Sequence, residues 1–129
     1  MDWTFRNDLP IYSQLVDQIK LAIVSGVFTP GMRLSSVRDM AAEAGVNPNT
    51  LQRALQELER AGLVFSQRTS GRFVTEDAAL IAREKKAIAA ERSGAFLEAM
   101  EALGYDRDAI IALLKEEKEE DAHGSDPDM

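Results

Sequence analysis

The sequence of 129 residues contains no cysteine, and its one histidine, His123, lies in a polar segment near the end. Without thiols there can be no disulfide bonds, thiolate zinc sites or cysteine nucleophiles. A single imidazole argues against a first-row metal site, so we expect no metal and no other cofactor. No paired nucleophile and base is visible, and no glycine-rich phosphate loop follows a strand. The composition therefore predicts a protein that is not an enzyme.

Long apolar runs are also missing. No segment approaches the roughly 18 apolar residues of a membrane span, and residues 1–7 lack the basic-then-apolar pattern of a signal peptide. We therefore expect a cytoplasmic protein with no membrane partner. The length suits one domain with an appendage.

The net charge of −7 at first argues against a polyanionic partner. The charge is unevenly distributed, however. Residues 1–75 hold one lysine and seven arginines against seven acidic residues, whereas residues 76–129 carry most of the acidic side chains. Since local charge matters more than total charge, the first part remains a candidate for nucleic-acid binding.

A capped amphipathic helix is predicted to begin at Asn47, whose side chain can accept from the first-turn amides, with Pro48 at the first helical position. Apolar residues at three- and four-residue intervals form its buried stripe: Leu51, Ala54, Leu55 and Leu58. The side chains left outward carry amides, a hydroxyl and a guanidinium: Asn49, Thr50, Gln52, Arg53 and Gln56. Such a face is typical of a recognition helix in the major groove, although an ordinary solvated helix also has a polar face.

The preceding segments complete a helix-turn-helix pattern. A first helix is predicted from Pro10 to a stop at Gly26. A short second helix is predicted from a Ser36 cap, with Asp39 three residues on, to Gly45. About four residues then separate the second and third helices, which is the spacing of a helix-turn-helix.

A β-hairpin is predicted after the third helix, with strands at 63–66 and 72–75 and a turn at 67–71. We expect it to pack on the helices through Leu63, Phe65, Phe73 or their neighbours. The turn of this hairpin can lie against the phosphate backbone of DNA, or it can simply be exposed to solvent and bind nothing. The predicted fold class is mainly α (α+β): a winged helix-turn-helix over residues 1–75.

Residues 76–121 are predicted to form two helices, from about 78 to 103 and after a cap at Asp106. Their apolar faces can dock on the winged helix or pair with a second copy of the chain. We favour pairing, because a helix-turn-helix dimer needs an interface that fixes the spacing of its half-sites. The residues assigned to this interface are Ile81, Ile88, Phe96, Met100, Leu103, Ile110, Leu113 and Leu114. Residues 122–129 are expected to be a disordered acidic tail.

Residues 9–76 resemble the GntR-type bacterial transcription regulators, and among them the short YtrA-like branch. The matching segments occur in the family's order and spacing: LPIYSQL (9–15), IVSG (23–26), PGMRL (30–34), SVRDMA (36–41), NPNTLQRA (47–54), LE (58–59), GL (62–63) and GRFV (71–74). The sequence departs from the family at Ser35, where proline is common, and at Thr69 and Arg72, where glycine and threonine are common.

The resemblance implies a homodimeric DNA-binding regulator, usually a repressor, that binds a (pseudo)palindromic operator. It also suggests that the regulator controls a transporter operon. It implies that the second half dimerises and is too short for a large effector-binding domain. No group of polar residues identifies a small-molecule effector. The DNA contacts are then expected from Ser36, Arg38, Asn47, Asn49, Thr50, Arg53, Arg68, Thr69, Ser70 and Gly71.

Among these residues, Asn49 can pair with adenine and Arg53 with guanine, so we expect both to read bases. We expect Arg38, Thr50 and the hairpin turn to hold phosphates. Arg53 has an alternative role as the ion-pair partner of Glu57, four residues on. The competing function, a winged-helix module for protein binding, would place aromatic or aliphatic anchors on the third helix, where this sequence has polar residues.

Overall fold

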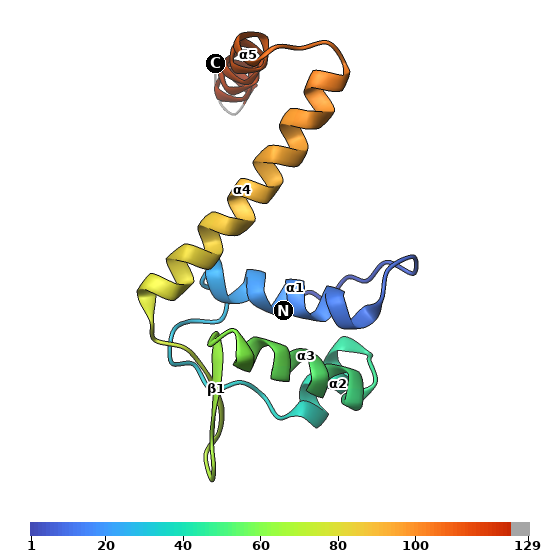
Figure 1. Cartoon of the computed structure of the whole chain (residues 1–129), viewed down its shortest axis with the longest axis vertical. Helices are drawn as coiled ribbons and strands as arrows, with labels where there is room; N and C mark the ends of the chain where they lie inside the picture. The colour runs from blue at the N-terminus through green and yellow to red at the C-terminus, as the bar shows by residue number, and fades with distance from the viewer. Residues whose placement is uncertain (125–129) are drawn as a thin grey trace. The chain divides into compact units, whose positions relative to one another are not determined.

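The computed structural model describes the backbone of residues 1–124 and the side chains of residues 1–117. Its elements are α1 (Ile11–Val24), α2 (Val37–Ala44), α3 (Pro48–Arg60), β1 (Val64–Gln67), β2 (Gly71–Val74), α4 (Ala78–Ala102) and α5 (Arg107–Gly124) (Figure 1). The chain divides into two compact units, residues 1–87 (unit 1) and residues 88–129 (unit 2), and each is described by itself. The mainly helical fold with one hairpin confirms the predicted class.

Helices α1, α2 and α3 of unit 1 enclose a single hydrophobic core. The apolar positions that recur at three- and four-residue intervals are the ones buried in it: Leu15, Ile19, Ala22 and Ile23 of α1, Met40 and Ala41 of α2, and Leu51, Ala54, Leu55 and Leu58 of α3. Burial of each large side chain contributes about 1.5–3 kcal/mol to folding. The core therefore fixes which face of α3 points outward.

Local caps set the ends of α2 and α3. The Ser36 hydroxyl accepts a hydrogen bond from the Asp39 amide at 3.1 Å, and α2 ends at Gly45, which has a left-handed φ of 72°. The Asn47 side-chain oxygen accepts from the Asn49 amide at 2.8 Å, and Pro48 occupies the first turn of α3. These contacts confirm the predicted caps and the turn between the two helices.

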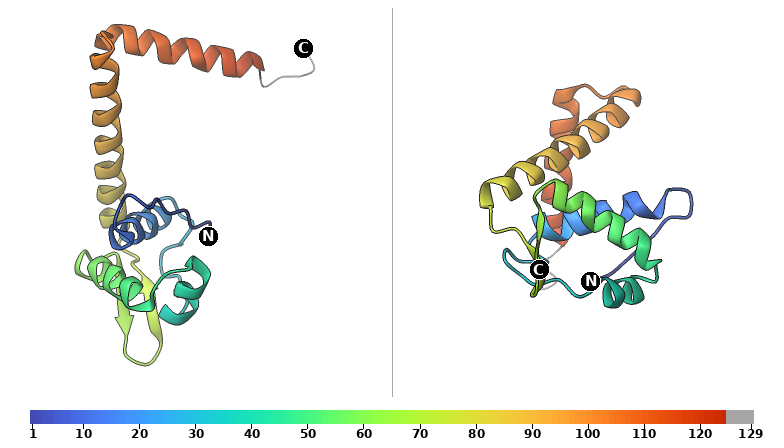
Figure 2. Two further views of the ribbon diagram at one scale, coloured as in Figure 1. Left: turned by 90° about the vertical axis from the view of Figure 1, so that its right-hand side faces the viewer. Right: turned by 60° about the horizontal axis from the view of Figure 1, so that its bottom comes forward.

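The hairpin is antiparallel, with Val64 opposite Val74 and Phe65 opposite Phe73. Leu63 and both valines are buried against the helices, whereas Phe65 is 39% exposed and stacks on Phe73. The expected packing on the helices is thus made by Leu63 and the two valines, whereas Phe65 lies on the other face of the hairpin, because side chains alternate between the two faces of a strand. The hairpin projects beyond the helices of unit 1 (Figure 2).

The segment before α2 pairs with β2 and extends the hairpin. The Leu34 amide donates to the Arg72 carbonyl and the Val74 amide donates to the Met32 carbonyl, both at 2.9 Å, and Arg33 forms a bridge with Phe73. This pairing fixes the distance between the hairpin and the N-terminus of α2. The sequence did not predict it, because a three-residue pairing leaves no periodic pattern.

Two glutamines of α1 hold the first residues of the chain. The Gln14 side chain accepts from the Arg6 amide at 2.7 Å and donates to the Arg6 carbonyl at 2.9 Å. Gln18 makes the equivalent pair of bonds with the main chain of Thr4. The segment so held carries Trp3 and Phe5, which stack on each other and pack against the core.

The beginning of α4 belongs to unit 1. Leu80 and Ile81 pack against its core. The Lys20 Nζ lies 3.6 Å from Glu84 Oε2. The Asp77 side chain caps the helix by accepting a hydrogen bond from the Leu80 amide. The winged-helix unit thus extends about twelve residues beyond the predicted boundary at 75. Ile81, which we assigned to the dimer interface, is a partly buried residue packed against the core of its own chain.

Unit 2 contains the rest of α4 and α5, which are separated at Gly104. The Asp106 side chain accepts from the Ala109 amide at 2.8 Å and caps α5, as predicted. Among the described side chains of this unit, Ile110 is buried, while Phe96, Leu103 and Leu114 are exposed. Helix α5 runs through Gly124, three residues into the expected tail, and residues 125–129 of that tail lie outside the described residues.

Candidate nucleic-acid interface

The outward face of α3 is polar along its length. Asn49, Arg53 and Gln56 are exposed and Thr50 and Gln52 are half-buried. These are the side chains that the apolar stripe predicted to point outward. Since the Asn47 side-chain oxygen is already bonded to the Asn49 amide, Asn47 can offer DNA chiefly its NH₂ group.

Arg53 lies on the flank of α3 that faces α1. Its guanidinium carbon is 4.7 Å from the centre of the Tyr12 ring, which is the geometry of a cation–π contact. Glu57, the alternative partner that we considered for Arg53, instead pairs with Arg60 at 2.9 Å. The sequence did not predict the Tyr12 contact, because the two residues lie on different helices.

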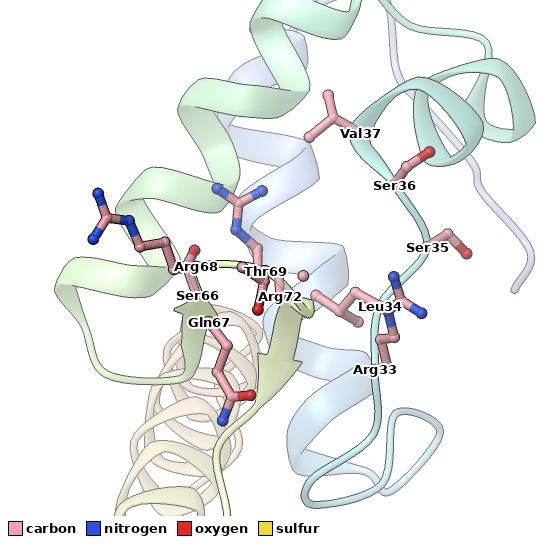
Figure 3. A pocket seen from close by; sticks show the side chains of 11 residues that line it. Arg33, Leu34, Ser35, Ser36, Val37, Ser66, Gln67, Arg68, Thr69 and Arg72 are labelled. Atoms are coloured by element: carbon pink, nitrogen blue, oxygen red, sulfur yellow. The ribbon is translucent and has the colours of Figure 1, made fainter.

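A groove lies between the N-terminus of α2 and the hairpin (Figure 3). Its volume is about 420 Å³. It gathers Ser36, Arg68, Thr69 and Gly71 from the predicted contacts and adds residues that were not predicted to contact DNA: Arg33, Ser35, Ser66, Gln67 and Arg72. None of the described residues that line it is acidic. Arginine, hydroxyl and main-chain groups together are suited to phosphate oxygens.

Arg33 lies across the hairpin at the edge of this groove. A Cβ atom added to Gly71 would lie 3.1 Å from the Arg33 Nε, and the φ of Gly71 is +109°. Glycine therefore allows both the main-chain turn and the close approach of the arginine. The signal that points to Arg33 is its isolated bridge with Phe73, which only the structure reveals.

Arg72 does not offer a free cation to the groove. Its Nε donates to Glu59 Oε1 at 2.9 Å, and Ser66 donates to the same oxygen. Burial alone would raise the pKa of Glu59, but the hydrogen bonds from Arg72 and Ser66 and the charge of Arg72 outweigh it and lower that pKa. Arg72 stands where the family commonly has threonine, so this sequence adds a cation to the hairpin. The structure instead uses Arg72 to tie the hairpin to α3.

The Glu59 contact predicts a pH-dependent contribution to stability. Because its pKa is depressed in the folded state, the contribution is complete above the ordinary carboxyl pKa of 4.5 and is lost as pH falls through the folded value. We expect Glu59→Gln to destabilise the protein by about 1 kcal/mol at pH 7, and by progressively less below pH of about 4.5. Urea denaturation across this range measures the difference.

Glu57→Gln is the matched control, because its partner Arg60 has a side chain that is 73% exposed and the pair contributes little. Equal losses in the two variants at pH 7 would contradict the assigned role of Glu59.

The remaining predicted contacts are exposed but are not all gathered in the groove. Arg38 stands in the first turn of α2 and Ser70 at the tip of the hairpin, and neither lines the groove. Ser36 lines the groove while its hydroxyl also caps α2.

The described part of the chain contains no group of three or more metal-binding side chains that could hold an ion. It also contains no helix with the length and hydropathy of a membrane span.

Comparison with known proteins gives consistent matches. Residues 11–74 match the family described as bacterial regulatory proteins, gntR family. YhcF of Bacillus subtilis, an uncharacterized HTH-type transcriptional regulator, is 37% identical over 115 residues, covering 89% of this chain and 95% of YhcF. The HTH-type transcriptional repressor YtrA of the same organism is 40% identical over 73 residues, covering 57% of this chain and 56% of YtrA.

Solved structures agree with these relatives. A GntR family transcriptional regulator from Listeria monocytogenes is 38% identical, with a TM-score of 0.81, and the match covers 87% of this chain and 98% of that one. The DNA-binding domain of AraR in complex with operator ORX1 is 25% identical, with a TM-score of 0.53, and the match covers 58% of this chain and 96% of that one.

Proposed function

Because this chain belongs to the GntR family of DNA-binding transcription regulators, we propose that it is a homodimeric repressor that binds a two-fold symmetric operator. In this proposal α3 enters the major groove, where Asn49 and Arg53 read base edges. Arg38 and the hairpin hold the phosphate backbone on either side of that groove. The observation that carries the proposal is the exposed amide, hydroxyl and guanidinium face of α3 beside a groove whose described lining has no acidic residue.

The contacts divide between sequence reading and positioning. Thr50, Arg38, Arg33 and the hairpin residues 68–71 carry groups that suit phosphate oxygens. Asn49 and Arg53 carry the planar groups that match adenine and guanine edges. A protein-binding surface would instead need aromatic or aliphatic anchors on α3, whereas the exposed residues of α3 that follow Pro48 are polar.

The homodimer would be formed by the apolar side chains of unit 2. Phe96 is 41% exposed, Leu103 73% and Leu114 48%, and such exposed apolar residues favour burial against a second copy. The proposed interface contains Ile88, Phe96, Met100, Leu103, Leu113 and Leu114, and it leaves out Ile110, which is already buried within its own chain. It omits Ile81, which packs in unit 1.

The repressive action and the regulated genes are inferred from resemblance. The relative YtrA is named a repressor, and a dimer seated on an operator can block transcription by occupying the DNA. A transporter operon remains our proposal for the target. Measuring transcripts with and without the protein in its host tests both statements, since repression predicts that the target transcripts rise when the protein is removed.

Salt dependence tests the DNA-binding surface. We expect affinity for a duplex of arbitrary sequence to fall steeply with NaCl, since phosphate neutralisation releases counterions. Arg38→Ala should reduce the slope of log affinity against log salt by about one for each phosphate that is no longer neutralised. Arg107→Ala, which removes an exposed arginine of α5, is the control and should leave the slope unchanged. A slope that neither substitution alters would exclude Arg38 as a phosphate-binding residue.

Gly71 provides a test of the hairpin and Arg33. We expect Gly71→Ala and Gly26→Ala to lose similar stability, about 1 kcal/mol, because both residues have a positive φ and the Arg33 side chain can swing aside. Only Gly71→Ala should weaken DNA binding, since it displaces Arg33 and alters the hairpin. Urea denaturation and DNA titration measure the two effects. Unchanged DNA affinity in Gly71→Ala would remove the hairpin from the interface.

A further inference from the structure

Tyr12 of α1 lies beneath an arginine of the DNA-binding face. Its half-buried ring packs against the core, and the guanidinium carbon of Arg53 stands 4.7 Å from the ring centre. The two residues belong to different helices, so the contact depends on how α1 and α3 pack together. The family resemblance assigned no role to Tyr12.

Stacking on a ring holds a guanidinium without using its hydrogen-bond donors. The ring offers no hydrogen-bond acceptor of the usual kind, so the N–H groups of an arginine held over it can still donate to a base. An ion pair would instead occupy those donors. The nearest acidic candidate on α3, Glu57, pairs with Arg60 at 2.9 Å, and no hydrogen bond or ion pair of the described side chains involves Arg53.

We propose that Tyr12 is a positioning residue for DNA recognition: its ring holds the Arg53 guanidinium at the edge of α3 with its donors available to a base. The proposal rests on the proposed function of Arg53 as a base-reading residue. Arginine loses much rotamer freedom when it is fixed on a base. A ring that restricts the side chain beforehand reduces that loss and strengthens the contact.

The ring, rather than the hydroxyl, carries this effect. The Tyr12 hydroxyl lies 3.5 Å from Glu57 Oε2, a distance at the limit of a hydrogen bond, and Glu57 already has Arg60 as a partner. Tyr12→Phe keeps an aromatic face beneath Arg53 and removes only the hydroxyl. Tyr12→Leu fills a similar apolar space and removes the aromatic face.

The experiment uses the full chain and a duplex operator selected from a random pool. The readout is the Kd for a variant duplex, in which the guanine read by Arg53 is replaced, divided by the Kd for the operator. We expect Tyr12→Leu to lower this ratio by about two- to five-fold for each half-site, the effect of an exposed cation–π pair. Tyr12→Phe should retain the ratio of the unsubstituted protein.

A double-mutant cycle separates positioning from a folding defect. In an Arg53→Ala background, Tyr12→Leu should cause no further loss of discrimination, because Tyr12 acts only through Arg53. An equal loss in both backgrounds, or an equal loss in Tyr12→Phe, would overturn the proposal. If Arg53→Ala alone leaves discrimination intact, the base-reading function of Arg53 fails. If Arg53→Ala abolishes discrimination while Tyr12→Leu preserves it, only the role of Tyr12 fails.

Discussion

Arg53→Ala is expected to abolish most of the preference for the operator over an operator whose contacted guanine is replaced, while binding to unrelated DNA changes little. A bidentate arginine–guanine contact discriminates by about 1–3 kcal/mol. A symmetric operator contains this contact twice, so the preference should fall by about thirty-fold or more. Arg53 is an exposed residue whose guanidinium carbon lies over the Tyr12 ring, so its removal leaves the core intact.

Titrations of three duplexes measure this prediction: the operator, the operator with both guanines replaced, and unrelated DNA. Arg38→Ala is the contrasting variant, because a phosphate contact should strengthen binding to all three equally. Similar losses in Arg53→Ala and Arg38→Ala on every duplex would refute the division between base reading and positioning.

Leu103→Glu is expected to convert the proposed dimer to a monomer. Leu103 is 73% exposed, so a carboxylate there is readily solvated in the monomer but would be costly in a buried interface. Without its second half-site, the protein should bind the operator about 10²–10⁴-fold more weakly. Analytical ultracentrifugation gives the mass, and titration of the operator gives the affinity.

Ala90→Glu is the matched control, because Ala90 is an exposed residue of α4 that is not part of the proposed interface. It adds the same charge and should preserve both the mass and the affinity. A dimer in Leu103→Glu, or a monomer in both variants, would contradict the proposed interface.

The features that the sequence predicted correctly are local ones. The caps at Ser36, Asn47 and Asp106 each join a side chain to an amide two or three residues ahead, so a single motif contains the whole interaction. The buried stripe of α3 repeats within one helix. Such features can be deduced without knowing how the helices pack.

The features that the sequence missed join distant segments. Tyr12 meets Arg53, Glu59 meets Arg72 and Arg33 meets Gly71, each across two separate elements. No periodicity marks these pairs, because each depends on how the helices and the hairpin pack. The packing of Leu80 and Ile81 on the core of unit 1, beyond the predicted boundary at residue 75, is a contact of the same kind.

Selection of the DNA sequences that the protein binds tests the central proposal most directly. Duplexes bound by the full chain would be selected from a random pool and sequenced. We predict a two-fold symmetric site whose half-sites repeat about one helical turn apart or a multiple of that distance, each with preferred bases where α3 enters the major groove. An asymmetric site with a single preferred block, or no preferred sequence at all, would contradict the account.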